Sequence, residues 1–184
     1  MKSKNRVCPL ENSGSLESTF RKLIHNPKKI LKPYLHSGMK VLDFGCGPGL
    51  FTIEAANQVG EKGKVIAADL QQGMLDKVKN KIKDKPYEKR IKLIKTQSNN
   101  ININEKVDFV LAFYVVHEFP TLDGFFRGIK EVMKADSKLL VIEPSFHVSK
   151  KEFKDTLNTA QRLGFKVISN PKFFLSRAVL LNLQ

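Results

Sequence analysis

Three glycines at alternate positions, Gly45, Gly47 and Gly49, follow a short apolar segment that ends in Asp43 and Phe44. Glycine lets the backbone turn tightly and approach a ligand closely. The residues after Gly49 have the apolar pattern of a helix, and a helix N-terminus offers unpaired N–H groups and partial positive charge to a bound anion. The order of strand, glycine turn and helix therefore predicts a ligand-binding loop.

The spacing of these glycines argues against a dinucleotide as the ligand. The dinucleotide fingerprint is Gly-x-Gly-x-x-Gly, and Leu50 stands at the position of its third glycine. Asp43, on the strand before the turn, suits a ligand ammonium group better than a pyrophosphate. A generic glycine turn with Asp43 as a cap is the alternative interpretation.

A second acid, Asp69, closes the next apolar segment, roughly twenty residues beyond the loop. A carboxylate at this place can accept hydrogen bonds from the ribose hydroxyls of a nucleoside. Alone, Asp69 is also explained as the N-cap of the following helix. Together with the glycine loop, it indicates a ligand that contains a nucleoside.

Histidines and acids follow the fourth and fifth predicted strands. His117 lies on the edge where ligands bind in parallel sheets, and the ordinary pKa of histidine suits proton transfer near neutral pH. We therefore predict His117 as a catalytic base; alternatively, it pairs with Glu118 or caps the following turn. His147 is a second candidate on the same edge. Glu118 and Glu143 are acids there that could bind a cationic acceptor, but we expect them to be only solvated.

Apolar periodicity supplies the elements that position these residues. Strands are predicted at residues 39–44, 64–69, 91–96, 107–113 and 138–143, and helices at 50–59, 72–83, 122–134 and 150–163. This alternation predicts a doubly wound α/β fold with a mostly parallel sheet. Residues 165–169 and 173–181 are strand-like with only three residues between them, so they must form a hairpin.

The 184 residues suffice for one domain with a sizeable core. We expect a single domain over residues 1–184, with an arm and helical lead-in at 1–35 and the core at 36–184. Residues 16–35 of the lead-in have Phe20, Leu23 and Ile24 on one helical face. They either form a lid that excludes water from the site or pack against the sheet.

The charge balance is unusual, because 32 Lys and Arg oppose 18 Asp and Glu, a formal net charge of +14. An acidic partner, such as RNA or an anionic surface, would explain it. However, the lysines form no stripe and no aromatic residues alternate with them, as they do in single-strand binders. A lysine-rich solvated surface is therefore favoured over a nucleic-acid interface.

Other classes of partner are disfavoured by composition. Cys8 and Cys46 form neither a disulfide framework nor a metal-ligand pattern, so no metal is expected. The longest apolar runs are too short to cross a bilayer, and no apolar stretch follows the basic residues at the N-terminus, as it would in a secretory signal. We expect a cytoplasmic protein with no membrane partner; the sequence sets no oligomeric state.

These features together resemble the class I S-adenosylmethionine-dependent methyltransferases. Residues 41–49 are similar to the family's glycine-rich motif, and Asp69 to its ribose-binding acid. The sequence Phe-Tyr-Val-Val-His-Glu-Phe at 113–119 resembles the segment after strand four in small-molecule members. The resemblance implies a Rossmann-like sheet of seven strands with an antiparallel C-terminal strand, S-adenosylmethionine as methyl donor and a small-molecule acceptor.

The resemblance also implies which residues lie around the donor: Asp43, Gly45, Cys46, Gly47, Gly49, Asp69, Leu70, Met74, Ser98, Asn99 and Phe113. Leu70 and Met74 would lie near the adenine. The family often has an acid after strand three that binds the adenine amino group, and here Ser98 and Asn99 stand there instead. A methyltransferase or donor-binding module that acts on RNA or protein stays as the alternative.

Overall fold

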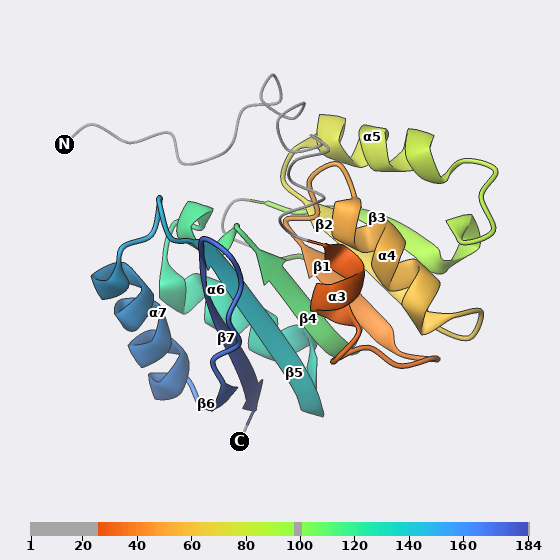
Figure 1. The fold of residues 1–184 in the computed structure, drawn as a ribbon. Coiled ribbons are helices and arrows are strands. Elements are labelled where there is room, and N and C mark those ends of the chain that lie inside the picture. The colour runs from red at the N-terminus through yellow and green to blue at the C-terminus, as the bar shows by residue number, and fades with distance from the viewer. Residues whose placement is uncertain (1–25, 98–100, 184) are drawn as a thin grey trace.

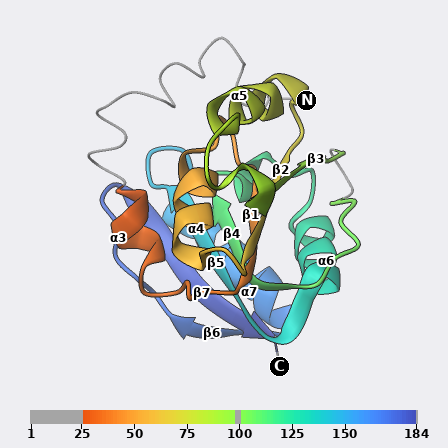
Figure 2. The ribbon, with the colours of Figure 1, turned by 90° about the vertical axis from the view of Figure 1, so that its right-hand side faces the viewer.

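The computed structural model describes residues 26–97 and 101–183 of the chain. These residues form one seven-stranded sheet with helices on both faces (Figure 1; Figure 2). The strand order is β3-β2-β1-β4-β5-β7-β6, and β7 is antiparallel to both of its neighbours. The predicted doubly wound sheet with an antiparallel C-terminal strand is therefore confirmed.

The elements have the following bounds. The strands are β1 (Lys40–Phe44), β2 (Lys64–Asp69), β3 (Ile91–Lys95), β4 (Val107–Phe113), β5 (Met133–Pro144), β6 (Phe165–Ser169) and β7 (Ser176–Leu183). The helices are α3 (Pro27–Leu31), α4 (Leu50–Val59), α5 (Gln72–Ile82), α6 (Leu122–Val132) and α7 (Lys150–Arg162), with short 3-10 turns η2 (Glu88–Arg90) and η3 (Val116–Glu118).

Two predicted boundaries are wrong by several residues. Strand β5 begins at Met133 and not at residue 138, because α6 ends at Val132 and the chain pairs with β4 at once. Met133 lies opposite Val107, and the register then shifts before the regular ladder resumes. Strand β7 begins at Ser176 and not at residue 173, and it extends to Leu183.

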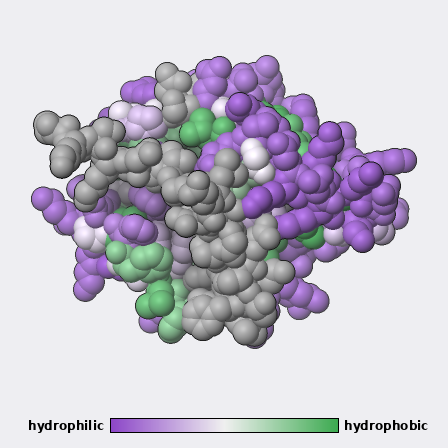
Figure 3. Space-filling model, turned by 90° about the horizontal axis from the view of Figure 1, so that it is seen from above, coloured by the Kyte–Doolittle hydropathy of each residue, from purple (hydrophilic) through white to green (hydrophobic). Residues whose placement is uncertain are grey.

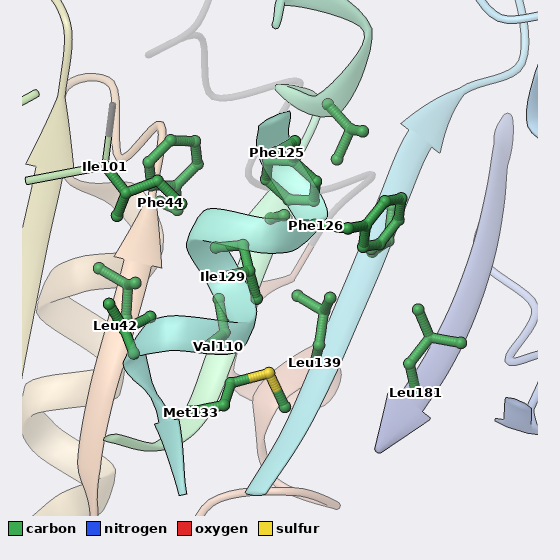
Figure 4. Packing of buried hydrophobic residues seen from close by; sticks show 14 of the residues in the cluster. Leu42, Phe44, Ile101, Val110, Phe125, Phe126, Ile129, Met133, Leu139 and Leu181 are labelled. Atoms are coloured by element: carbon green, nitrogen blue, oxygen red, sulfur yellow. The ribbon is translucent and has the colours of Figure 1, made fainter. Parts of the chain in front are cut away.

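Helices α6 and α7 cover one face of the sheet. Phe125, Phe126 and Ile129 of α6 are fully buried against strand residues such as Leu139 (Figure 4). Burial of one such side chain contributes about 1.5–3 kcal/mol, so this face stabilises the ends of β4 and β5. Helix α7 begins at Ser149 in a capping box, in which the side chains of Ser149 and Glu152 each bind the other residue's backbone N–H.

Helices α3 and α4 cover the opposite face. Asn26 caps α3 by accepting a hydrogen bond from the Lys29 N–H, and Pro27 occupies the first helical position, where a missing N–H costs nothing. Ile30 and Leu31 of α3 are buried with residues of α4 and with alternate strand residues. The two faces together hold the carboxyl ends of β1, β2, β4 and β5 at one edge of the sheet, which lies at the top of Figure 1.

Several predictions fall on residues 1–25, 98–100 and 184, which lie outside the described part of the chain. These are the arm, the first part of the lead-in with its suggested lid, Cys8, Ser98 and Asn99. Within the described residues, no helix has the length and apolar character needed to cross a membrane.

Candidate active site at the carboxyl edge of the sheet

The glycine loop rests on the end of strand β2. The N–H groups of Gly45 and Cys46 both donate to the carbonyl oxygen of Ala68, at 2.8 and 3.0 Å. Gly45, Gly47 and Gly49 have φ values of +71°, +51° and +85°, a region that costs a residue with a side chain about 1–2 kcal/mol. All three glycines are therefore required by the backbone path of the loop.

Gly45 and Gly47 differ in the space around them. A Cβ at Gly45 would lie 2.4 Å from Cγ2 of Val115, whereas a Cβ at Gly47 would meet no atom of the described residues within 4 Å. Val115 is two residues before His117, so the segment after β4 packs directly against the first glycine of the loop. The second glycine lies beside open space, where a ligand can approach the backbone.

Asp69 ties the loop to the end of β2. Its carboxylate accepts hydrogen bonds from the N–H groups of Gly47 and Gln71, both at 2.9 Å. Burial raises the pKa of the Asp69 carboxyl, and these backbone hydrogen bonds oppose that rise. A carboxylate oxygen has more than one lone pair, so Asp69 can hold the loop and also accept a hydrogen bond from a ligand hydroxyl.

Asp43 is more deeply buried than Asp69. Its carboxylate accepts a hydrogen bond from the hydroxyl of Thr52 on α4 at 2.6 Å. Burial raises the pKa of Asp43 to about 7, and the neighbouring charge of Asp69 adds to that rise, while the Thr52 hydrogen bond opposes it. A cation bound beside Asp43 would relieve this cost, as expected of a site for a ligand ammonium group.

Cys46 is buried inside the loop. Burial raises the pKa of its thiol, and the charges of Asp43 and Asp69 raise it further. Since the thiolate is the nucleophilic form of cysteine, Cys46 is not activated for covalent chemistry. Among the described residues, no group of three or more His, Cys, Asp or Glu side chains is arranged to hold a metal ion.

Three further residues expected near the donor lie on neighbouring elements. Met74 is buried on α5, and Leu70 is half-buried directly after β2. Phe113, at the end of β4, lies between Phe51 and Tyr114, with ring centroids 4.4 and 4.2 Å away. Phe113 therefore forms part of an aromatic cluster beside the glycine loop.

His117 pairs with Glu143, which the sequence did not predict. The Glu143 carboxylate contacts Nδ1 of His117 through one oxygen and accepts a hydrogen bond from the Val116 N–H at 2.8 Å through the other. Only 1% of Glu143 is exposed. The expectation that Glu143 is a solvated acid was wrong, because its two oxygens are both bound by the turn that carries His117. Glu118, the partner suggested by sequence proximity, is not the acid that binds this ring nitrogen.

His147 lies next to His117. The two rings are nearly parallel, with centroids 6.0 Å apart and an angle of 16° between their planes. Phe146 contacts His147 at a centroid distance of 5.3 Å and meets Tyr114 edge-on at 6.5 Å. The two predicted histidines are thus brought together at the ends of β4 and β5, within an aromatic surrounding.

The residues of this site form two adjoining groups at one edge of the sheet. One contains Asp43, the glycine loop and Asp69, and the other contains His117 and Glu143 with their aromatic neighbours. Sequence reasoning missed Thr52 and Val115 as supports of the first group and Glu143 as the partner of His117. No spacing in the sequence links Thr52 to Asp43, Val115 to Gly45 or Glu143 to His117. These residues meet because neighbouring strands of the sheet, and the contact with α4, bring them together.

S-adenosylmethionine fits the first group of residues. The open space beside Gly47 allows a ligand to approach the loop. Two buried carboxylates, on Asp43 and Asp69, lie at neighbouring strand ends and can bind the ammonium and ribose groups of the donor. Fold and site together define a class I S-adenosylmethionine-dependent methyltransferase domain.

Comparison with known proteins gives the family directly. The model of a family described as "Methyltransferase domain" matches residues 35–171, and the chain belongs to this family. Curated relatives include a demethylmenaquinone methyltransferase of Lactobacillus johnsonii, 32% identical over 64% of this chain and 49% of that protein. A ubiquinone/menaquinone biosynthesis C-methyltransferase of a Shewanella species is 29% identical over 58% of this chain and 43% of that protein. The chain thus matches about half the length of these relatives or less.

Solved structures show the same fold over nearly the whole chain. A SAM-dependent methyltransferase from Aquifex aeolicus has a TM-score of 0.85 and 25% identity, covering 97% of this chain and 100% of that one. A structure from Methanococcus maripaludis has a TM-score of 0.78 and 15% identity, covering 100% of this chain and 97% of that one, and shows the fold alone.

Proposed function

We propose that this protein transfers the methyl group of S-adenosylmethionine to a small-molecule acceptor, with His117 as the base that removes a proton from the acceptor. The observation that carries the proposal is the buried contact between Glu143 and Nδ1 of His117. His117 lies on the segment after β4, and Val115 of the same segment packs against Gly45 of the glycine loop. The base and the donor loop are therefore neighbours.

On the donor side, each proposed contact follows from the chemistry of the side chain. Asp43 binds the ammonium group, and Asp69 accepts hydrogen bonds from the ribose hydroxyls. The methionine part of the donor lies along the glycine loop, and Leu70 and Met74 flank the adenine. When bound, the donor supplies an electrophilic methyl group on a sulfonium. The protein then has to hold the acceptor in line, and such positioning can contribute about 7–11 kcal/mol to the lowering of the barrier.

On the acceptor side, Glu143 decides what His117 can do. A carboxylate at Nδ1 selects the tautomer with the proton on that nitrogen, so Nε2 carries the lone pair that can accept a proton. The same carboxylate stabilises the imidazolium that forms after proton transfer, as in other histidine–carboxylate pairs. Glu143 is therefore a positioning residue, and His117 is the proposed base.

The surroundings of His117 favour a flat aromatic acceptor with an acidic proton. Tyr114, Phe146 and His147 present ring faces and edges at this side of the site, and aromatic rings pair well in stacked and edge-on arrangements. The names of the curated relatives, which refer to demethylmenaquinone and to ubiquinone and menaquinone biosynthesis, agree with this class.

The test is methyl transfer to a panel of soluble naphthols, hydroquinones and catechols, with S-adenosylhomocysteine measured by mass spectrometry. We expect wild type to form the product with at least one class. In the His117→Ala variant, kcat should fall about 10²–10⁴-fold, the usual contribution of a general base, with donor affinity unchanged. Turnover by His117→Ala at the wild-type rate would contradict the proposed base.

The role of Glu143 has its own readout in the pH–rate profile. In Glu143→Gln the imidazolium loses its carboxylate partner, so the pH at which the base becomes protonated should move downward. Glu118→Gln, which changes an acid on the same 3-10 turn, is the matched control and should leave the profile in place. Equal shifts in both variants would assign the effect to general charge and not to the Glu143 contact.

A further inference from the structure

The exposed apolar side chains of the described chain gather in its last part. The large ones are Phe146, Val167, Ile168, Phe174 and Leu175. Three of them, Phe146, Phe174 and Leu175, lie in the β5–α7 and β6–β7 connections and are 70%, 64% and 53% exposed. We call these three residues the apolar loop patch. Large exposed apolar patches usually mark interaction sites.

The two loops of the patch are held together by specific contacts. The Ser145 N–H donates to the Leu175 carbonyl at 2.9 Å. Ser176, the next residue, forms a 2.6 Å hydrogen bond with the Tyr114 hydroxyl, and the Tyr114 ring contacts Phe146 edge-on. The patch is thus one preformed surface that continues into the aromatic surrounding of His117.

The backbone at the patch is strained. Leu175 and Tyr114 have φ values of +49° and +59°, in the left-handed region. This region is unfavourable for residues with bulky side chains. Leu175 regains little by burial, because more than half of it is exposed. Strain without burial is typical of residues kept for a function.

The patch is flanked by positive charge. Residues 144–151 and 170–177, which contain the two loops, include Lys150, Lys151, Lys172 and Arg177 and no acidic residue. The acids next to the first range are Glu143, which is buried, and Glu152, which accepts a hydrogen bond from the Ser149 N–H. The three lysines are exposed. Figure 3 looks down on this edge of the molecule and shows an apolar area beside hydrophilic surface.

We propose that the apolar loop patch binds the surface of an anionic lipid bilayer. The aromatic and leucine side chains enter the boundary between headgroups and acyl chains, and the lysines contact anionic headgroups. Binding of this kind needs no membrane-spanning helix, and the described residues contain none. The proposal thus differs from the expectation, drawn from the sequence, of no membrane partner. The edge that carries His117 then faces the lipid. The proposal concerns binding and does not depend on the identity of the methyl acceptor.

The test is flotation of the full chain with vesicles of phosphatidylcholine alone and with 30% phosphatidylglycerol. We expect binding to the anionic vesicles, little binding to the neutral ones, and a decrease as salt is raised. Phe146→Ser with Phe174→Ser should weaken the partition coefficient about 100-fold, or about tenfold for each buried phenyl group. Lys150→Gln with Lys151→Gln should weaken it about fivefold per lysine.

The matched control is Lys62→Gln with Lys64→Gln, two exposed lysines at the opposite edge of the sheet, which should bind vesicles like wild type. S-adenosylmethionine titration and the thermal midpoint verify that each variant is folded. The proposal would be overturned if wild type did not bind anionic vesicles, or if the double serine variant bound them as well as wild type does. It would also be overturned if the opposite-edge lysine variant lost as much binding as Lys150→Gln with Lys151→Gln. A further outcome would also contradict it: the protein binds random RNA in a salt-sensitive way, the RNA competes with vesicles, and the serine substitutions do not change RNA binding. The positive charge would then be explained by a nucleic-acid partner.

Discussion

The donor half and the acceptor half of the site are built in different ways. In the donor half, the glycine loop and Asp69 bind one another through backbone groups, and Asp43 is buried against Thr52. In the acceptor half, histidines and aromatic residues from the segments after β4 and β5 meet one another and Ser176 of β7, and several stay exposed. We call the donor half closed, because its buried carboxylates and loop N–H groups are hydrogen-bonded within the protein, and the acceptor half open, because several of its side chains are exposed.

This difference indicates where each half can tolerate change. A loop whose path needs left-handed glycines, and whose N–H groups are already bound, allows few substitutions. A set of side chains displayed from separate loops can vary without loss of the fold. Substitutions in the closed half should therefore have the largest effects, and substitutions in the open half the smallest.

The largest effect is expected from the glycines. Gly45→Ala introduces a Cβ that overlaps Val115 and also strains the backbone, so we expect a loss of about 2–5 kcal/mol in the free energy of unfolding. Gly47→Ala has the strain without the overlap and should lose about 1–2 kcal/mol. Urea unfolding of both variants measures the difference; equal losses would contradict the role of Val115.

Gly38→Ala is the control for these variants. Gly38 also has a positive φ and open space around it, and it precedes β1 at the opposite edge of the sheet. It should lose as much stability as Gly47→Ala but keep the donor affinity of wild type, whereas Gly47→Ala should bind the donor less tightly.

A smaller effect is expected from the ionisation of Asp43. With its pKa at about 7, the carboxylate should be mostly protonated at pH 6 and mostly ionised at pH 8. If the ionised form binds the donor ammonium group, affinity should rise about tenfold between these pH values. Calorimetric titrations of wild type and Asp43→Asn test this, and a similar pH dependence in the variant would contradict it.

The same carboxyl has a predictable effect on stability. Its pKa in the folded protein lies above the unfolded value, so the folded state binds more protons between about pH 4 and pH 7. For an acid this means that the contribution to stability falls as pH rises through that window. Asp43→Asn should therefore be more stable than wild type at pH 8, and the difference should shrink toward pH 4.

The smallest effect is expected in the open half. Asparagine tolerates the left-handed conformation better than leucine does, and Leu175 gives up little burial when it is replaced. Leu175→Asn should therefore raise the free energy of unfolding by about 0.5–1 kcal/mol. A loss of more than about 1 kcal/mol in thermal or urea unfolding would show that Leu175 packs for stability and is not held under strain.

The contrast between the halves also explains what the sequence predicted. The glycine loop and Asp69 lie on neighbouring strands and follow a local pattern of strand, turn and helix, so their meeting was expected. The strands themselves were predicted from periodicity, although the predicted starts of β5 and β7 were wrong. The start of β5 was missed because the helical pattern runs up to Met133. Site residues can therefore be predicted from the sequence where their contacts follow directly from their order along the chain.

The acceptor half could not be predicted in the same way. Glu143 reaches His117 because β4 and β5 are adjacent parallel strands, and no spacing in the sequence gives the register between them. Sequence proximity pointed to Glu118 instead. In the same way, Tyr114 and Ser176 are 62 residues apart and meet only because β7 returns beside β5.

The most direct test of the account is calorimetric titration of S-adenosylmethionine into wild type, Asp69→Ala and Asp76→Ala. Asp69 is predicted to hold both the glycine loop and the donor, and hydrogen bonds to a charged group contribute about 1.5–3 kcal/mol each. We expect micromolar binding by wild type and by Asp76→Ala, which changes an exposed α5 acid that contacts Gln72, and at least about a 100-fold loss in Asp69→Ala. Absence of binding by wild type, or equal binding by Asp69→Ala, would contradict the proposed donor site.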